Sequence, residues 1–201
     1  MLLLQEQEKP TKFRLEHMNV GILQVGQVAP EVMAAIAEGL RKTYPDTAAD
    51  LITDVLSVPQ GAFDKKRSQY NSSLLLNEVR VYAAKKKQVF HRILGVVDAD
   101  MYAFGLNYVF GEAYTPGVAA LVSVWRLKPE FYKDKPNQAL NLLRAQKEAV
   151  HEVGHTLGVK HCPRSLCVMH FSNSIFDTDK KQNLLCDECY LQAAIAISNL
   201  G

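Results

Sequence analysis

Apolar residues follow two spacings along the chain from about residue 20 onward, and the two spacings alternate. Short, almost wholly apolar runs such as residues 93–97 are typical of buried strands, whereas longer stretches with apolar residues every three or four positions are typical of helices. Strands are predicted at residues 20–25, 51–58, 93–97, 107–114 and 118–125. Helices are predicted at residues 30–44, 68–86, 138–157 and 187–199.

The order of these elements predicts the fold class. Strands alternate with helices in the first half, which favours parallel pairing, and Thr115-Pro116-Gly117 is a turn that joins the last two strands as a hairpin. We therefore expect an α/β or α+β fold with a mixed, twisted sheet, an antiparallel edge strand at 107–114 and helices packed on it. The chain is expected to form a single domain over residues 1–201.

Composition says more about the expected partners of the protein than about its fold. The 201 residues are 48% hydrophobic and 22% charged, with a formal net charge of +2, so a nucleic-acid partner is not predicted. Met1–Leu4 is too short for the apolar core of a signal peptide, and the sequence has no apolar run of about 18 residues that could span a membrane. We expect a cytoplasmic monomer without a membrane partner.

The most specific motif is residues 151–161, which match the pattern H-E-x-x-H-x-x-G-x-x-H. His151 and His155 are four positions apart, so on a helix both imidazoles lie on one face and can bind one metal. Glu152 lies about 100° further around the same helix, where it can reach a water at that metal without being a ligand. The pattern predicts a zinc site with an adjacent base.

The end of the motif predicts how a third ligand arrives. Gly158 is expected to end the helix, because glycine adopts left-handed backbone angles without a Cβ penalty, and the turn brings His161 to the metal. Three imidazoles leave one position of a tetrahedral zinc open, as catalytic sites require. Glu152 would take a proton from the attacking water and pass it to the departing amine. The alternative is a helix with surface histidines and a chance C-cap.

All four cysteines lie close together after this motif, as Cys162-x4-Cys167 and Cys186-x2-Cys189. Paired short spacings of this kind are typical of a structural zinc with four thiolate ligands. Two disulfides are the competing interpretation, weakened by the absent export signal, and a redox Cys-x-x-Cys would leave the other pair unexplained. Cys162 follows His161 directly, so a second metal would fix the segment that carries the third histidine.

These motifs together resemble the archaemetzincins, a family of metzincin-like metalloproteases. The resemblance is carried by the string at 151–161, by Cys162 directly after it, by Cys-x4-Cys-x-Met ending at Met169, and by the last Cys-x-x-Cys. Weaker similarity extends over most of residues 18–200, in stretches that begin at Arg67, Asp98 and Asn107.

The resemblance implies a catalytic zinc, a structural zinc and a peptide or small-protein substrate. The residues that it assigns are His151, His155 and His161 on the catalytic zinc, Glu152 as general base, Met169 in a methionine turn under the metal, and Cys162, Cys167, Cys186 and Cys189 on the structural zinc. It also implies that the substrate lies antiparallel to the edge strand, expected at 107–114; the alternative is a plain edge strand that binds no ligand. Tyr108 and Tyr114 are both candidates to stabilise an oxyanion, and the sequence does not choose between them.

Two other functions compete with a zinc peptidase. One is a two-zinc binding or scaffold protein without hydrolytic activity, which the intact Glu152 argues against. The other is a cysteine-zinc nucleic-acid module within 162–189, for which the flanking basic residues are few. These basic residues are Lys160, Arg164, Lys180 and Lys181.

Several other polar residues are expected to have structural roles. His17, His91 and His170 are expected at the surface or in hydrogen bonds within the core, although His170 lies close enough to Met169 to line a cleft. Asp98 and Asp100 are expected to end a strand or cap a turn rather than to bind metal.

Overall fold

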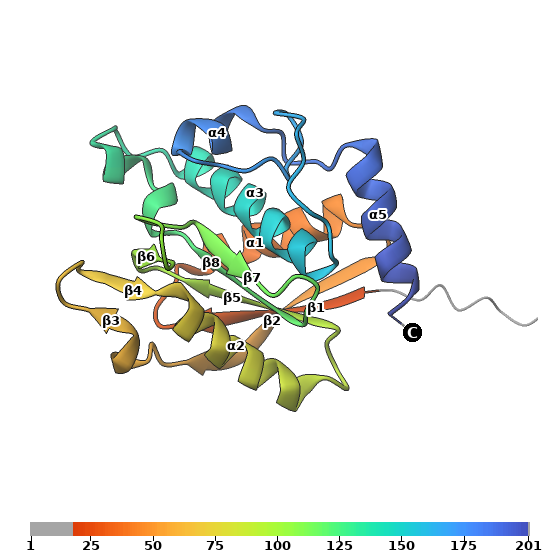
Figure 1. The fold of residues 1–201 in the computed structure, drawn as a ribbon, viewed down its shortest axis with the longest axis horizontal. Coiled ribbons are helices and arrows are strands. Elements are labelled where there is room, and N and C mark those ends of the chain that lie inside the picture. Colours follow the sequence, from red (N-terminus) through yellow and green to blue (C-terminus); the bar gives the residue numbers. More distant parts are fainter. Residues whose placement is uncertain (1–17, 201) are drawn as a thin grey trace, which may run out of the picture.

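The computed structural model describes residues 18–200, and Figure 1 shows their arrangement. Met1–Leu4 and His17, on which two of the expectations above rest, lie outside the described residues. The main sheet contains β1 (Met18–Val25), β2 (Thr47–Leu56), β5 (Arg92–Val97), β7 (Gly111–Ala113) and β8 (Ala119–Ser123). The helices are α1 (Pro30–Thr43), α2 (Ser72–Lys86), α3 (Gln138–Thr156), α4 (Ile175–Lys180) and α5 (Asp187–Ser198).

The main sheet confirms the predicted class of fold. Its five strands lie in the order β2-β1-β5-β8-β7; the first four are parallel, and β7 pairs antiparallel with β8 at the edge. A second, small sheet contains β3 (Phe63–Asp64), β4 (Gln69–Asn71) and β6 (Met101–Tyr102). Three short 3₁₀ helices complete the elements found in residues 18–200: η1 (Gln60–Ala62), η2 (Trp125–Leu127) and η3 (Pro129–Tyr132).

The main sheet is buried on both faces, which explains why its central strands are almost wholly apolar. On β5, Leu94 and Val96 join a core with residues of α1 and α3, whereas Ile93 and Val97 join a second core with residues of α2. Figure 1 shows the same division, with α1 and α3 on one side of the sheet and α2 on the other.

Helix α3 carries the first part of the H-E-x-x-H motif and packs on β8 and β7. It begins after Asn137, whose side-chain oxygen accepts a hydrogen bond from the Leu140 N–H at 3.0 Å and so caps the helix. Its second half, from Arg144 onward, is almost entirely buried. The H-E-x-x-H motif is therefore held on a buried helix at the antiparallel edge of the sheet.

The observed edge strand is shorter than predicted. Only Gly111–Ala113 pairs with β8 as a strand, although Phe110 and Tyr114 each add one backbone hydrogen bond to it. Residues 103–109 leave the sheet because their polar groups bond elsewhere: the Val109 N–H donates to the Met101 carbonyl, and the Tyr108 hydroxyl donates to the Asn173 carbonyl.

The second strand also differs from its prediction, since β2 runs from Thr47 to Leu56 instead of over 51–58. Its first residues lack an apolar run, but they pair with β1 through the backbone, in register with Met18 and Asn19. The small sheet and α4 were not predicted at all, because elements of two to six residues are too short to show a hydrophobic period.

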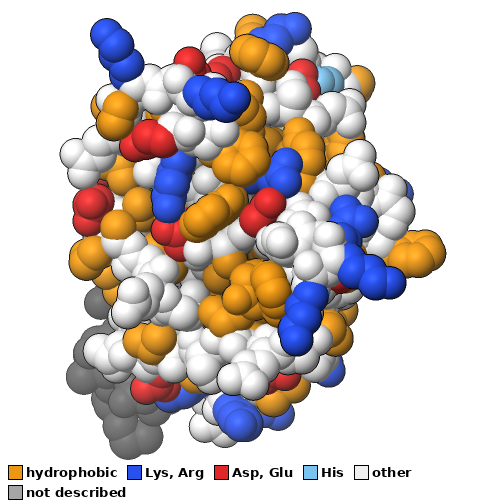
Figure 2. Space-filling view, turned by 90° about the vertical axis from the view of Figure 1, so that its left-hand side faces the viewer, with side chains coloured by type: hydrophobic (Ala, Val, Ile, Leu, Met, Phe, Trp, Pro, Cys, Tyr) orange, Lys and Arg blue, Asp and Glu red, His pale blue; other side chains and the backbone are white. Residues whose placement is uncertain are grey.

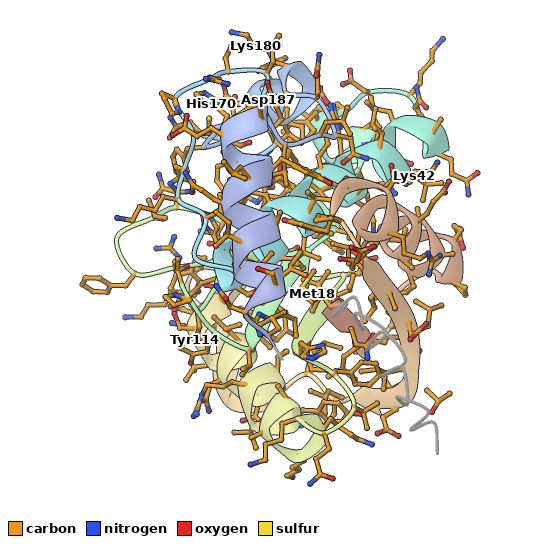
Figure 3. The ribbon with its side chains drawn as sticks, turned by 90° about the vertical axis from the view of Figure 1, so that its right-hand side faces the viewer. Met18, Lys42, Tyr114, His170, Lys180 and Asp187 are labelled. Atoms are coloured by element: carbon orange, nitrogen blue, oxygen red, sulfur yellow. The ribbon has the colours of Figure 1, made fainter. Side chains whose placement is uncertain are left out.

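The last helix, α5, matches its prediction over 187–199 closely. Figure 3 shows α5 running from Asp187, which lies at the top of the view with the loop carrying His170, towards the level of Met18 at the start of β1. Ala193 and Ile197 on α5 join the same core as Met18. Within residues 18–200, no helix combines the length and apolar character that crossing a membrane requires.

Candidate active site

The three histidines of the motif meet at one point. The Nε2 atom of His155 lies 3.0 Å from Nε2 of His151 and 3.2 Å from Nε2 of His161. Two imidazole nitrogens bound to one tetrahedral zinc at about 2.0–2.1 Å lie roughly 3.4 Å apart, so this arrangement is close to a zinc-binding geometry. Of the described residues, these three form one of two clusters that could hold a metal ion.

The other ring nitrogens explain why the site suits a cation. The Nδ1 atom of His151 lies 2.9 Å from the Val168 carbonyl oxygen, and Nδ1 of His155 lies 2.8 Å from the Val159 carbonyl oxygen. A carbonyl can only accept, so both Nδ1 atoms carry the proton and both Nε2 atoms present lone pairs. Lone pairs that converge without a shared proton repel each other unless a cation lies between them. The donor set therefore fits zinc.

Burial keeps these imidazoles neutral. It lowers the pKa of His151 and His155 below the ordinary value of 6.5, and the positive charge of Lys181 adds to the effect on both. The pKa of His161 is also lowered, mainly by burial. Neutral imidazoles are the form that binds a metal.

The turn after α3 has the geometry that the motif predicts. Gly158 has a φ of +85°, the left-handed region that favours glycine. The Gly158 N–H donates to the His155 carbonyl at 2.9 Å, and the Val159 N–H donates to the Gly154 carbonyl at 3.1 Å. These bonds end the helix and reverse the chain, which brings His161 back to the two histidines of α3.

Met169 is fully buried and packs against α3 at Gly154. A Cβ added at Gly154, between the two histidines of the helix, would lie 2.5 Å from its Sδ atom and 2.9 Å from the Tyr44 hydroxyl oxygen. Glycine at 154 therefore allows the methionine and the tyrosine to approach the helix backbone. Met169, which the resemblance assigns to a methionine turn under the metal, thus packs against α3 between the two helical histidines.

Glu152 faces the opposite way, towards the edge strand. A Cβ added at Gly111 would lie 2.5 Å from the Cγ and Cδ atoms of Glu152 and would overlap its Oε1 atom. Burial raises the pKa of Glu152 well above its ordinary value, and nearby Glu148 adds to the shift, while Lys181 opposes it. A divalent cation on the histidines would also oppose it, because an opposite charge within about 4–6 Å favours the ionised form.

An open cleft of about 820 Å³ runs past this cluster. One wall is the edge strand β7 with residues 106–110, and the other is the segment 171–173. The Tyr108 hydroxyl lies 2.7 Å from the Asn173 carbonyl oxygen and so connects the two walls at one end. Tyr114 belongs to neither wall and lies with its ring near Arg80.

The four cysteines form the second cluster that could hold a metal, with their sulfur atoms within 4.8 Å of one another. The Sγ atoms of Cys162 and Cys186 lie 3.8 Å apart. Two sulfurs bound to one tetrahedral zinc at about 2.3 Å also lie roughly 3.8 Å apart, whereas a disulfide requires about 2.0 Å. All four cysteines are free, and the geometry favours a four-thiolate metal site.

The thiols differ in how readily they ionise. Burial opposes ionisation of Cys186, but hydrogen bonds from Cys189 and from the other thiols outweigh it and lower its pKa to about 7. Burial is the main cause that raises the pKa of Cys167 and Cys189. One thiol is therefore ready to bind a metal at neutral pH, whereas these other two must lose protons first.

Four of the residues expected to have structural roles form ion pairs or hydrogen bonds with other parts of the protein. The Asp100 carboxylate accepts two hydrogen bonds from the Arg126 guanidinium, and Asp98 is ion-paired with Lys128 at 2.6 Å. His170 Nδ1 lies 2.9 Å from the Cys162 carbonyl oxygen, and His91 Nδ1 accepts a hydrogen bond from the Asn19 N–H.

The surface does not favour the nucleic-acid module. Lys181, one of the four basic residues considered for it, is fully buried. Figure 2 shows basic and acidic side chains interspersed around a hydrophobic centre on one face of the molecule, without a continuous basic patch there. Lys181 is instead ion-paired with Glu148.

Comparisons with known proteins show the family of this chain. The model of peptidase family M54 matches residues 33–194. An archaemetzincin of Pyrococcus abyssi is 41% identical over 172 residues, which cover 84% of this chain and 90% of the relative. The chain belongs to peptidase family M54, the archaemetzincins. It is therefore a zinc-dependent peptidase.

Solved structures of relatives share the fold. The crystal structure of an archaemetzincin from Methanopyrus kandleri superposes with a TM-score of 0.79 at 33% identity, covering 91% of this chain and 97% of that one. A zinc-dependent peptidase from Methanocorpusculum labreanum gives 0.78 at 26% identity, covering 87% and 99%.

A buried ion pair lies beside the site of this archaemetzincin, and none of the sequence motifs includes it. Lys181 Nζ lies 3.0 Å from Glu148 Oε1, with side chains 0% and 3% exposed, and Glu148 also accepts a 2.8 Å hydrogen bond from the Thr178 hydroxyl. The pair connects α3 to the segment after α4. Glu148 precedes His151 and Glu152 by three and four positions, so helical spacing could have placed it on the same face. Nothing in the sequence marks Lys181 as its partner.

We predict that Lys181→Met destabilises the folded protein by about 3–5 kcal/mol, because it leaves the Glu148 carboxylate buried without its counter-charge. Urea unfolding measures the change. The double variant Lys181→Met/Glu148→Gln should recover part of the loss. Lys180→Met, which removes an exposed lysine one position away, is the control. Equal losses in the single and double variants would contradict this role of the pair.

Proposed function

We propose that His151, His155 and His161 hold the zinc of this peptidase through their Nε2 atoms. The proposal is supported by the converging lone pairs described above and by the neutral state of the rings. Zinc bound there supplies Lewis acidity, which makes water nucleophilic near neutral pH and polarises a carbonyl group. This convergence is the observation that carries the proposal.

Glu152 acts as the general base. Its carboxylate takes a proton from the water that attacks the peptide carbon, and it passes that proton to the amine nitrogen as the C–N bond breaks. The position of Glu152 supports this role, because its side chain lines the cleft next to the histidines and to the edge strand. Its burial favours proton uptake once water attacks.

The peptide substrate lies along β7 as an additional antiparallel strand. The Phe110 carbonyl and the Tyr114 N–H bond to β8, so the alternation of an antiparallel ladder turns the backbone groups of Gly111 and Ala113 to the free edge. In this orientation the substrate residues after the cleaved bond pass Phe110 and Tyr108, and the residues before it pass Thr115.

A second zinc binds to Cys162, Cys167, Cys186 and Cys189 and has a structural role. The segment that it would fix runs from His161 past Met169 and includes the carbonyl of Val168, which orients His151. Backbone bonds from Val168 N to Leu184 O and from Gln182 N to Leu166 O join the two cysteine pairs. The cysteine site thus stabilises the ligand geometry of the catalytic site without taking part in chemistry.

Replacement of Glu152 tests the proposed mechanism. Glu152→Gln removes the proton acceptor but keeps the shape of the side chain, so kcat should fall about 10²–10⁴-fold with the metal retained. Cleavage of a peptide library by the zinc-loaded protein measures the rate, with Glu130→Gln, an exposed site, as the control. A variant that cleaves at the wild-type rate would rule out Glu152 as the base.

Metal content distinguishes the two sites. Elemental analysis should find two zinc ions in the wild type and one in His151→Ala. Cys186→Ser should also lose one zinc and melt at a lower temperature, because binding energy at a structural site contributes to folding. Wild-type protein with a single zinc would contradict the cysteine site.

Proton release on metal binding tests the assignment of the ligands. At pH 7 the histidines are already neutral, because burial lowers their pKa, whereas Cys167 and Cys189 carry protons, because burial raises theirs. Calorimetric zinc titration of the metal-free protein in two buffers should therefore give the same total proton release for wild type and His151→Ala. Cysteine-site affinity should weaken as the pH falls. Release of more than one additional proton by the wild type would contradict the neutral histidines, because a zinc-bound water can account for at most one.

A further inference from the structure

We propose that Gly111 is a positioning residue for catalysis: its missing side chain leaves the space in the edge strand that the Glu152 carboxyl group occupies. The inference rests on the general-base role proposed for Glu152 and extends it to the residue that determines where this base lies. Gly111 is outside the zinc motif and outside the cysteine cluster.

The Glu152 side chain lies closer to the Gly111 backbone than any residue with a Cβ atom at position 111 would allow. A Cβ at position 111 would lie 2.5 Å from both the Cγ and the Cδ of Glu152, and it would overlap Oε1. Carbon atoms that are not bonded to each other normally stay about 3.5–4.0 Å apart. The outer half of the Glu152 side chain therefore fills the volume of an ordinary side chain on β7.

The backbone at this position does not itself require glycine. The described glycines with positive φ are Gly26, Gly105 and Gly158. Gly111 instead pairs with Val122 of β8 as an ordinary strand residue, a conformation that every amino acid adopts. Glycine weakens a strand, and in a strand interior it often marks the close approach of another group. Space for Glu152 is the reason that the contacts provide.

Helix α3 cannot move back to make room for a larger residue. Gly154 lies about 200° around the helix from Glu152, and on that side the backbone is in close contact with Met169 and Tyr44. The Tyr44 hydroxyl also donates a 2.6 Å hydrogen bond to the Val150 carbonyl. The helix is thus held between the edge strand and the residues beneath it, and only the Glu152 side chain is free to turn.

Little else fixes the Glu152 carboxylate. Among residues 18–200 no hydrogen bond or ion pair to it is found, so the slot at Gly111 is the main constraint on its position. The backbone of Gly111 also faces the free edge, where the substrate strand is proposed to pair. One residue therefore brings the base and the peptide backbone next to each other.

Gly111→Ala tests this role through kinetics. The added methyl group should turn the Glu152 carboxylate away from the attacking water and lower kcat by at least ~100-fold, the effect expected of a displacement of about 1 Å. KM should change little, because the backbone groups of residue 111 remain. Zinc content should equal that of the wild type. Gly61→Ala is the control, since a Cβ there meets no heavy atom within 4 Å.

A double-variant cycle on the zinc-loaded protein tests the contact without measuring activity. Gly111→Ala should lower the Tm when Glu152 is present. In the Glu152→Ala background the obstructing atoms are gone, so Gly111→Ala should leave the Tm unchanged or raise it, because alanine suits a strand better than glycine. A Tm change of Gly111→Ala that differs in this way between the two backgrounds is specific to the contact between residues 111 and 152.

The outcomes separate this inference from the proposed function. A Gly111→Ala enzyme with wild-type kcat, or the same Tm shift in both backgrounds, would overturn the inference while the peptidase mechanism stands. If the wild type cleaves no peptide in a Glu152-dependent way, the proposed mechanism fails, and the Tm cycle then decides the Gly111 contact by itself.

Discussion

The meeting of three imidazole rings at one place is the constraint on which the rest of this structure depends. The rings can face each other only because their opposite nitrogens are fixed by carbonyl oxygens, from Val168 for His151 and from Val159 for His155. Those two carbonyls lie on different segments, one after the glycine turn and one beside Met169. The chain after α3 must therefore fold back under the helix before the histidines can meet.

The cysteine cluster and the buried ion pair both act on that returning chain. Cys162 follows His161 and Cys167 precedes Val168, so two of the four clustered thiols are sequence neighbours of a histidine of the site and of the carbonyl that orients His151. Lys181 adds a connection from the end of α4 back to Glu148 on α3.

Much of this arrangement could be predicted from sequence, for reasons that differ between its parts. The long strands and helices follow from periodic burial, and His151, Glu152, His155 and His161 follow from helical spacing and a glycine stop. Short elements such as α4 have too few residues to show a hydrophobic period. The extent of the edge strand depends on hydrogen bonds made by the adjoining loop, such as the one from the Tyr108 hydroxyl, which the sequence does not reveal.

Contacts between distant segments were the other part that sequence could not provide. Gly111 and Glu152 are separated by 41 positions and touch only because α3 packs across β7. Lys181 follows the more ordinary Lys180 in a polar stretch, and only the packed structure distinguishes the buried residue from the exposed one. A lone glycine in a short strand and one lysine of a pair carry no local signal of such roles.

The division of the core by the main sheet also bears on how this protein can change over evolutionary time. The side covered by α1, α3 and α5 contains every metal-ligand candidate, whereas the side under α2 contains none of them. Substitutions on the α2 side, for example at Leu75, Val79 and Ile93, can therefore change the melting temperature in lineages that adapt to heat or cold. The selectivity for peptides stays the same, because these residues are remote from the metal-ligand candidates.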